Sequence, residues 1–442
     1  MNLQMPSNAD FERGEVPVTL SGWTMPQGIS HPWPVLEGDT ETSVAVIGAG
    51  LAGSSLALHL AEAGVAVTVI EARQPGWGAS GRNAGHVLPI LRDLNVLEKY
   101  TDGGRRFLEL FREHLTIPYD LSRRHGIDCD AVRSGYVNGM RSERALDAFR
   151  RQHGDLERAG IQRLVPLSPE EMHRRLGTGA YPYGVLFEDG GRVNPYLFTN
   201  GMIAAAARMG TRVHGDSEAL SINRTGSRWC VRTAHGSVTA DRVVFCTNAY
   251  PGKAVPALQD AFYPLTAYAI TTRPLPPEAL ELVLPGGGTF AQVPVDLNPI
   301  VRDRHHRLIL SSIPRSGGAK DADWHFRSQL RWLHRTWPAT RGMTIEMETY
   351  WTGRVAMRDR QFPGVFELQD GVYGLMYFNA WGNVMAPLMG KLLADALAKD
   401  DPGRLPFPLE TPEPVSMPCK QELLIRHLLI PAARTAQRLG II

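Results

Sequence analysis

The segment from 44 to 72 constrains the fold of this chain more than any other. An apolar stretch runs directly into Gly48-x-Gly50-x-x-Gly53, a helix of small residues follows, and a second apolar stretch ends at Glu71. This order predicts a βαβ unit that binds a dinucleotide, because the three glycines permit a sharp turn, close approach of the backbone to a pyrophosphate, and tight packing of the helix on the sheet. Glu71 follows Gly48 by 23 residues, near the spacing of about 20 expected of the carboxylate that holds the adenosine ribose. The alternative is a glycine-rich turn in an ordinary α/β domain.

The bulk composition narrows the class of protein. A chain of 442 residues exceeds the usual size of one hydrophobic core, so we expect two packed domains. The formal net charge of +2 gives no reason to expect nucleic acid as a partner. No run approaches the roughly 20 apolar residues that span a bilayer and no secretory signal is visible, so the expected location is cytoplasmic. We expect neither a disulfide framework nor a metal site, because the four cysteines are scattered without a CxxC pair: Cys129, Cys230, Cys246 and Cys419.

The pattern along the chain predicts an α/β (α+β) fold with two interleaved domains. The first forty residues are rich in Pro, Gly and Trp without a helical or strand period, which is typical of an extended arm. Between 263 and 345, alternating strands broken by one polar helix indicate a second domain built from discontinuous segments. The expected division is an arm at 1–40, a Rossmann-like FAD-binding domain at 41–97, 189–262 and 346–405, a second domain on a mixed β-sheet at 98–188 and 263–345, and a C-terminal tail or helix at 406–442.

A second glycine cluster decides which dinucleotide is expected. The run Gly76–His86 follows Glu71 after only a few residues, where a nicotinamide enzyme would usually enter another crossover helix. Its small residues let a long cofactor lie extended across the domain, and Ser80 could reach a phosphate or ribityl oxygen. These features favour FAD over NAD, with a glycine-rich surface loop as the alternative.

This run, G-W-G-A-S-G-R-N-A-G with the preceding Glu71-Ala72, resembles the FAD-binding region of the D-amino-acid oxidase/sarcosine oxidase superfamily, and most closely its gamma-glutamylputrescine oxidoreductase-like branch. Looser matches are D-G-G-R-V-N-P at 189–195, V-V-F-C-T-N-A-Y at 243–250 and W-T-G-R-V-A-M-R-D-R-Q-F-P-G at 351–364. The resemblance implies a flavoenzyme that oxidises a C–N bond of an amine or amino acid by hydride transfer to flavin N5, after which the imine is hydrolysed. Two other readings stay open: a flavin monooxygenase of related fold, and a partner-dependent or non-catalytic flavin subunit of a larger complex.

The two glycine motifs and the resemblance together give a set of expected FAD contacts. The first motif and its acid are expected at the ADP half, the second cluster along the pyrophosphate and ribityl path, and a turn before the last long helix at the flavin. The expected contacts are Gly48, Gly50, Leu51, Ala52, Gly53, Glu71, Ala72, Arg73, Gly78, Ala79, Ser80, Arg82, Asn83, Ala84, Val213, Thr247, Gly353, Trp381, Gly382, Asn383 and Val384.

Two positions bear on how FAD is held. Relatives that attach flavin through cysteine carry it between Gly353 and Met357, and relatives that use histidine carry it where this chain has Arg82; neither residue type is present, so we expect non-covalent FAD.

Relatives usually have a more glycine-rich turn where this chain has Trp381 and Asn383. The identity of the substrate therefore does not carry over from the resemblance.

Three residues are candidates for contact with substrate. His86 could contact flavin or substrate or pack under the ring; Tyr268 could face a pocket or belong to the core; and Arg302 could bind a carboxylate or lie in a solvated hairpin. No catalytic dyad is evident.

The electron acceptor and the C-terminal segment are left with alternatives. Sarcosine-oxidase-like relatives use a lysine above flavin N5 to speed reaction with oxygen, and no lysine lies between Lys253 and Lys320. The acceptor is therefore either O2 or a quinone or other carrier. The segment from Lys420 to Ile442 is basic and apolar and could contact a membrane surface. The alternative is a helix docked on the FAD domain, since Pro431 divides the segment.

Overall fold

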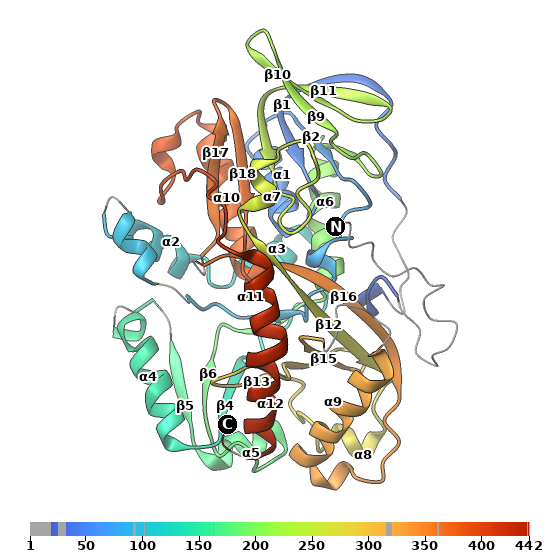
Figure 1. The fold of residues 1–442 in the computed structure, drawn as a ribbon, viewed down its shortest axis with the longest axis vertical. Helices are drawn as coiled ribbons and strands as arrows, with labels where there is room; N and C mark the ends of the chain where they lie inside the picture. Colours follow the sequence, from blue (N-terminus) through green and yellow to red (C-terminus); the bar gives the residue numbers. More distant parts are fainter. Residues whose placement is uncertain are drawn as a thin grey trace.

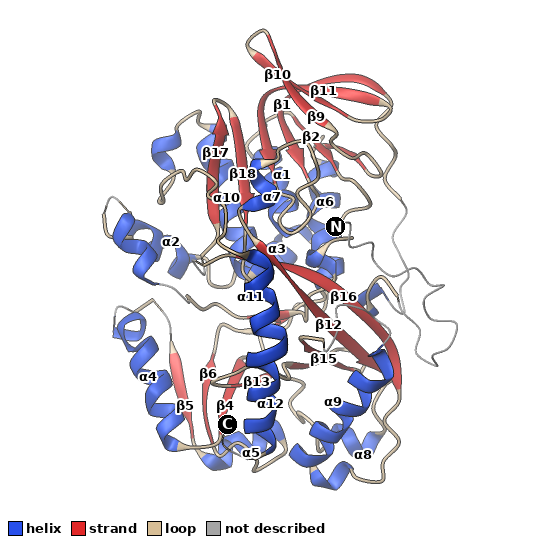
Figure 2. Cartoon of the chain, viewed as in Figure 1, coloured by secondary structure: helices blue, strands red, loops and turns tan. Residues whose placement is uncertain are grey.

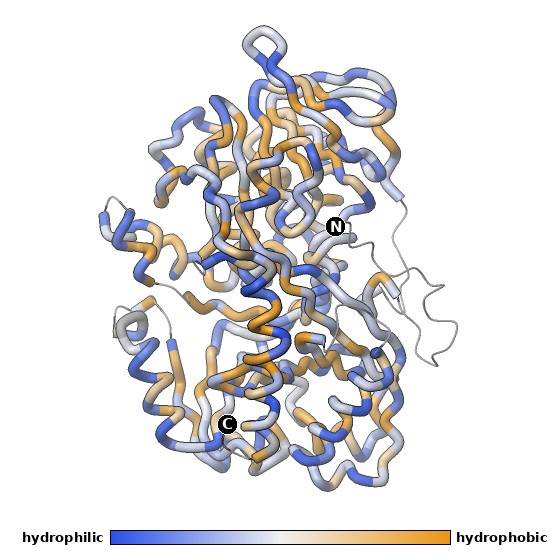
Figure 3. Tube along the Cα trace, viewed as in Figure 1, coloured by the Kyte–Doolittle hydropathy of each residue, from blue (hydrophilic) through white to orange (hydrophobic). Residues whose placement is uncertain are grey.

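Two β-sheets organise the chain, one in the upper and one in the lower half of the view in Figures 1 and 2. The computed structural model describes residues 19–24, 32–91, 94–100, 102–158, 160–161, 163–314, 321–359, 362–439 and 441. Apolar residues concentrate along the strands of both sheets, as the orange segments of Figure 3 show. Much of the arm predicted at 1–40 lies outside the described residues.

The first sheet carries the predicted βαβ unit. Strand β1 pairs in parallel with β2 and β11, and β11 with β18, whereas β17 joins the edge antiparallel. The spatial order is β17 (Gly364–Gln369), β18 (Val372–Met376), β11 (Gly236–Phe245), β1 (Gly38–Ile47), β2 (Val67–Ile70) and β8 (Arg212–His214), with β10 (Arg228–Arg232) and β9 (Ser221–Thr225) continuing from β11.

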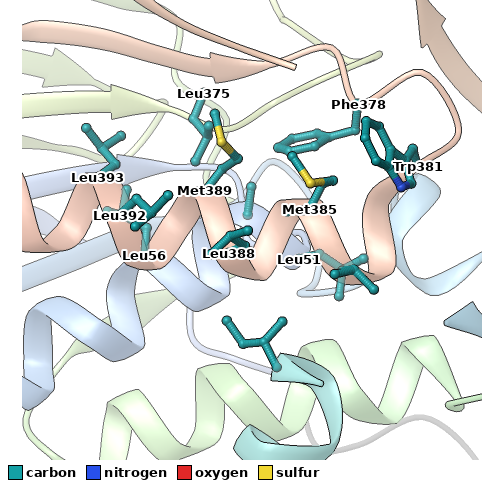
Figure 4. Close-up of a cluster of buried hydrophobic side chains, with 14 of the residues drawn as sticks. Leu51, Leu56, Leu375, Phe378, Trp381, Met385, Leu388, Met389, Leu392 and Leu393 are labelled. Carbon is teal, nitrogen blue, oxygen red and sulfur yellow. The ribbon is translucent and has the colours of Figure 1, made fainter. Parts of the chain in front are cut away.

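Helices pack tightly beside this sheet. Helix α1 (Leu51–Glu62) lies against α10 (Gly382–Ala398) and α6 (Pro195–Arg208). The approach of α10 to α1 requires a glycine, because a Cβ at Gly390 would lie 2.9 Å from the Ala52 carbonyl oxygen. Figure 4 shows the apolar contact, in which leucines and methionines of α10 meet Leu51 and Leu56 of α1. The helix that follows the predicted glycine motif therefore packs closely against both α10 and α6.

The second sheet is mixed, as predicted. Its neighbours are antiparallel except β13 and β4, which pair in parallel. The order is β16 (Met347–Met357), β12 (Tyr263–Thr272), β15 (Leu308–Ser312), β14 (Ile300–Arg302), β13 (Thr289–Gln292), β4 (Tyr136–Met140), β6 (Tyr183–Phe187) and β5 (Leu164–Leu167).

Further elements surround the two sheets. The remaining α-helices are α2 (Arg105–Glu113), α3 (Ile117–His125), α4 (Glu143–Arg158), α5 (Pro169–Leu176), α7 (Ala257–Asp260), α8 (Pro277–Leu280), α9 (Ala322–Thr336), α11 (Pro418–Leu424) and α12 (Ile430–Arg438), with a π-helix (Ile425–Leu429) between the last two. A two-stranded ribbon joins β3 (His86–Val87) to β7 (Gly191–Arg192). Short 3-10 turns lie at Gly22–Thr24, Ala79–Gly81, Leu94–Lys99, Pro338–Thr340 and Pro402–Arg404.

Two predicted domain limits differ from this arrangement. Residues 346–405 were expected in the first domain, but β16 belongs to the second sheet because it pairs with β12 along its whole length. Residues 98–188 were expected in the second domain, but α3 packs on α6 and α10 because Ile117 and Leu121 are buried there. We propose that the domain limits shift accordingly.

Residues 22–24 are buried in the interior. The Trp23 side chain is 1% exposed, and its indole Nε1 donates to the Asn83 carbonyl oxygen at 2.8 Å. A Cβ at Gly85 would lie 2.7 Å from the Trp23 ring, so this glycine makes room for the indole. Trp23 thus packs directly under the second glycine cluster.

The C-terminal helix docks on the second sheet rather than on the FAD-binding domain, the alternative considered above. Helix α11 lies on β12, and α12 continues over the second unit (Figure 1). The Arg434 guanidinium donates to the Ser312 hydroxyl and to the Ile313 carbonyl oxygen, both at 3.0 Å. Pro431 does not end the helix, because the π-helix Ile425–Leu429 runs directly into α12 and both Leu429 and Ile430 have helical φ and ψ.

Candidate active site

One cavity extends between the two sheets. It encloses about 1410 Å³ of empty space, including its open mouth. Its walls come from the elements of both sheets. Predicted FAD contacts that line it are Gly50, Leu51, Ala52, Ala79, Ser80, Arg82, Asn83, Ala84, Gly353, Trp381, Gly382, Asn383 and Val384. Predicted contacts outside its walls are Gly48, Gly53, Glu71, Ala72, Arg73, Gly78, Val213 and Thr247.

The first glycine motif forms a cradle at the N-terminus of α1. Gly48 has a φ of +100°, and a Cβ at Gly53 would lie 2.0 Å from the Gly48 carbonyl oxygen. The Ser80 hydroxyl accepts a hydrogen bond from the Leu51 N–H at 2.9 Å and lies 2.7 Å from where a Cβ of Gly50 would stand. The free N–H groups of a helix N-terminus bind phosphate, so this cradle fits a pyrophosphate.

Glu71 lies at the end of β2, beside the glycine motif. Its carboxylate accepts from the Ala49 N–H at 2.8 Å and from the Arg73 N–H at 3.0 Å. Burial raises the pKa of the carboxyl, and these backbone donors oppose that rise by stabilising the charged form. The adjacent strand β8 brings Val213 opposite Val69. Glu71 therefore follows the carboxyl end of β2 and Val213 lies within the neighbouring strand β8, on the side of the sheet where an adenosine is predicted.

A pair of amides joins the second glycine cluster to α10. Asn383 Nδ2 donates to Asn83 Oδ1 at 2.9 Å and to the His86 carbonyl oxygen at 2.8 Å. Asn83 Nδ2 in turn donates to Asn383 Oδ1 at 3.2 Å and to the Ser80 carbonyl oxygen at 2.8 Å. These bonds fix the start of α10, which the sequence analysis assigned to the flavin end, against the cluster expected along the ribityl chain.

Arg82 braces the cluster against the second sheet. Its Nε donates to the Trp77 carbonyl oxygen at 2.6 Å and its Nη1 to the Thr352 carbonyl oxygen at 3.1 Å, next to Gly353. The guanidinium carbon lies 4.8 Å from the centre of the Trp77 ring. Burial lowers the pKa of Arg82 to about 10, so the side chain stays charged at neutral pH. It anchors the cavity wall that it was predicted to line.

The turn before α10 holds non-glycine residues in the left-handed region. Tyr377, Asn379 and Ala380 have φ values of 64°, 50° and 62°. The Asn379 amide compensates locally, because its Oδ1 accepts from the Arg358 N–H at 2.9 Å and its Nδ2 donates to the Tyr377 carbonyl oxygen at 2.9 Å. Trp381 then begins α10 at 4% exposure, its indole N–H lacking a partner among the described residues. The turn keeps its shape without the glycines usual at this place.

His86 lies in the cavity wall beyond the amide pair. Both ring nitrogens are shielded from solvent without a hydrogen-bond partner among the described residues, and the ring meets Tyr136 edge to face at 5.2 Å. Burial lowers the pKa of His86 to about 3, so the imidazole is neutral at physiological pH. A neutral imidazole with unused nitrogens can donate one hydrogen bond and accept another.

The other two substrate candidates are engaged elsewhere. Tyr268 borders the cavity, but its hydroxyl accepts from Gln329 Nε2 at 2.9 Å, and its ring stacks on His325 of α9 at 4.4 Å. Arg302 is outside the cavity walls. Its guanidinium donates to three carbonyl oxygens of the segment 280–285, at Leu280, Val283 and Pro285.

Most residues of the cavity wall that faces the glycine cradle were not predicted from the sequence. Ala267 and Ala269 stand on either side of Tyr268 in β12, and Ser311 of β15 pairs with Ala269; small residues at alternate positions of a strand are the signal that could have found them. Asp296 and Arg354 are the charged residues of this wall and carry no such signal. The other lining residues that were not predicted are Leu88, Tyr136, Cys246, Asn248, Pro299, Val355, Phe378, Ala380 and Ala386.

The residues present fit an extended FAD. The cradle of α1 could hold the pyrophosphate, the acid at the end of β2 the adenosine ribose, and the amide pair with the unpartnered Trp381 indole the flavin end. The facing sheet presents the small side chains of Ala267, Ala269 and Ser311 to the cavity, and these leave room above the path predicted for FAD.

Comparisons with known proteins agree with this geometry. A family model described as DAO, FAD dependent oxidoreductase, matches residues 43–396. Gamma-glutamylputrescine oxidoreductase of Escherichia coli (strain K12) is 30% identical over 378 residues, which cover 84% of this chain and 86% of that protein. Among solved structures, glycine oxidase from Bacillus cereus ATCC 14579 has a TM-score of 0.65 at 20% identity, covering 81% of this chain and 96% of that chain. L-proline dehydrogenase from P. horikoshii has a TM-score of 0.66 at 20% identity, covering 83% and 95%. The solved structures share the fold.

Proposed function

Because this chain belongs to the DAO family of FAD-dependent oxidoreductases, we propose that it oxidises a C–N bond of an amine or amino acid. When bound, FAD supplies a two-electron acceptor, and the protein binds and orients the substrate against it. The observation that carries this proposal is the continuity of one cavity from the glycine cradle to the side chains of the second sheet. A small substrate held by that sheet would meet the flavin end of the cofactor.

His86 is proposed as a contact for the substrate or the flavin. Its ring nitrogens have no partner among the described residues, and its neutral state lets it accept a hydrogen bond without adding charge. Replacing it by Leu, which cannot form that bond, should raise the substrate concentration for half-maximal reduction by about tenfold, the effect of one neutral hydrogen bond. An unchanged concentration would mean that the ring only packs.

The flavin is proposed to be non-covalent. The described residues from Gly353 to Met357 include no cysteine, and Arg82 stands where a histidine would attach. Cys246 lines the cavity, but burial raises the pKa of its thiol far above neutral pH, so it stays protonated. Acid precipitation should leave all the yellow colour in the supernatant.

An anaerobic screen tests the reaction. The purified flavoprotein is mixed with gamma-glutamylputrescine, glycine, L-proline and a range of primary and N-alkyl amines, and the flavin absorption band is followed. At least one amine should bleach the band without any added protein. A band that stays unbleached by every amine, but bleaches with NADPH, would support the monooxygenase instead. Bleaching that needs a second protein would support the partner-dependent subunit.

A carrier other than O2 is proposed to take the electrons. Among the described residues that line the cavity there is no lysine. After anaerobic reduction by the best amine of the screen, reoxidation by a soluble quinone should be faster than by dissolved oxygen at equal concentration. Faster reoxidation by oxygen would make the protein an oxidase.

Contact of the C-terminal helix with a membrane surface is a separate proposal. None of the helices in the described part of the chain has the length and apolar character needed to cross a bilayer. Yet Leu423, Leu424, Leu428 and Leu429 are each at least half exposed along one short stretch beside Lys420. The double variant Leu424→Ser/Leu428→Ser should bind anionic vesicles less than the parent protein does. Leu220, beside the first sheet, is about as exposed, and Leu220→Ser should bind the vesicles as the parent does. Equal partition of all three would contradict the proposal.

A further inference from the structure

The inner face of α12 is polar and buried. Gln437 is 7% exposed, and its Nε2 donates to Asn298 Oδ1 at 3.0 Å and to Gln292 Oε1. One turn earlier, Arg434 holds Ser312 and the carbonyl of Ile313. A buried amide is stable only when it is paired, so Gln437 requires these partners. A helix that only covered an apolar surface would carry apolar residues at such positions.

The amide of Asn298 continues the chain of hydrogen bonds inward. Its Nδ2 donates to Gln329 Oε1 at 2.6 Å, and Gln329 Nε2 donates to the Tyr268 hydroxyl at 2.9 Å. The side chains of Asn298, Gln329 and Tyr268 are 7%, 1% and 1% exposed. A continuous buried relay therefore runs from α12 through α9 to β12.

Each strand or loop that the relay holds also borders the cavity. The loop containing Asn298 presents Asp296 and Pro299 to it, β15 presents Ser311 beside Ser312, and β12 presents Ala267 and Ala269 on either side of Tyr268. All of these belong to the second sheet or its loops, and none is part of the glycine cradle. Movement of α12 would thus displace the wall that faces the cradle and leave the cradle in place.

We propose that α12 positions the substrate wall of the cavity, with Gln437 and Arg434 as positioning residues that tune substrate affinity without touching substrate or FAD. This inference rests on the proposed function only in naming the ligand of that wall as an amine. Gln437 is the sharper probe, because its one NH2 group serves two acceptors, Asn298 Oδ1 and Gln292 Oε1.

Three full-length variants test the relay. Gln437→Ala removes the donor. Gln437→Glu keeps the size of the side chain but replaces its NH2 donor by a carboxylate oxygen. That oxygen would face two acceptors, Asn298 Oδ1 and Gln292 Oε1. Thr435→Ala changes an exposed position two residues away on the same helix and is the matched control.

The first measurement needs no ligand. Amide hydrogen exchange of the holoprotein should quicken at least tenfold in the segment 293–299 in Gln437→Ala and more in Gln437→Glu, with the segment 79–86 and the Thr435→Ala variant unchanged. Bound FAD per chain, read from the visible band, should be the same in all. Unchanged exchange in 293–299, or equal loosening of 79–86 with loss of FAD, would overturn the proposal.

The second measurement uses the amine that bleaches the flavin at the lowest concentration in the screen above. Its half-maximal concentration should rise about fivefold in Gln437→Ala and further in Gln437→Glu, with the limiting rate of bleaching changed less than twofold. A lower limiting rate at an unchanged half-maximal concentration would contradict positioning. If no amine bleaches the parent protein, the proposed function fails while the exchange measurement still decides the role of α12.

Discussion

The two ends of the cavity are built in different ways. The end that we propose for the cofactor comes from two short glycine runs and one helix start, where the distance between functional groups is set within a few residues of chain. The end that we propose for the substrate is assembled from side chains of β4, β12, β15, β16 and a loop, and a chain of hydrogen bonds joins it to the last helix. The first is a local motif and the second a product of tertiary structure.

The largest expected effect tests the local end. In Gly53→Ala the new Cβ would lie 2.0 Å from the Gly48 carbonyl oxygen, a rigid backbone atom, so the cradle has to open. The purified variant should contain no FAD by visible absorbance. Gly179→Ala, where no heavy atom lies within 4 Å of the new Cβ, should stay fully yellow. A yellow Gly53→Ala protein would break the claim that the cofactor end tolerates no change of backbone spacing.

Arg302 tests whether a charged residue of the second unit supports structure or substrate. In Arg302→Ala three carbonyl oxygens lose a charged donor, so the free energy of unfolding should fall by about 2–3 kcal/mol in urea titrations. The half-maximal amine concentration should not change. Arg273→Ala, which removes an exposed ion pair with Glu346, should lose less than about 1 kcal/mol. A raised amine concentration with unchanged stability would return Arg302 to the substrate site.

The next effect concerns pH. The pKa of His86 falls to about 3 in the folded protein from 6.5, so the unfolded chain binds the extra proton as pH drops below 6.5 and the folded state loses stability. Between pH 7 and pH 5 this loss should reach about 2 kcal/mol, because its slope approaches 1.36 kcal/mol per pH unit below pH 6.5. In urea titrations His86→Gln should lose correspondingly less stability over that range, whereas the exposed His235→Gln should behave as the parent. Identical slopes for all three would show that His86 is solvated.

A smaller effect is expected at the amide pair of Asn83 and Asn383, which joins the second glycine cluster to α10. Asn383→Ala removes the bonds to Asn83 and to the His86 carbonyl oxygen, which should weaken FAD binding by about tenfold, or roughly 1.4 kcal/mol. The dissociation constant is measured by fluorescence on reconstitution of the apoprotein, with the exposed Asn223→Ala as control. An unchanged constant would mean that the start of α10 is fixed by packing alone.

The smallest effect tests the strained turn before α10. Ala380 has a φ of 62°, which glycine adopts without the steric penalty of a Cβ. Ala380→Gly should stabilise the protein by about 0.5 kcal/mol, seen as a small rise in Tm. A fall in Tm would show that the methyl group contributes more through packing than the turn loses through strain.

The sequence predicted what depends on neighbours in the chain. The glycine motif, Glu71 and the second cluster predict FAD binding because the chemistry fixes their spacing, and FAD as the cofactor is confirmed while the individual contacts stay predictions. The mixed second sheet was predicted from alternation and is confirmed. Membership of β16 in the second sheet was missed because a Gly-containing segment suits either sheet until its partner β12 is known. Asp296 and Arg354 were missed for the same kind of reason, since only tertiary contact brings them to the cavity.

The buried indole of Trp23 has a consequence for where this protein can be cut. The family match spans 43–396, which omits both the indole under the second glycine cluster and the glutamine at the far end of the relay. A domain excised at those limits would keep every recognisable motif and lose a support at each end of its cavity. We therefore expect the smallest stable form of this oxidoreductase to extend beyond the residues that the family model matches.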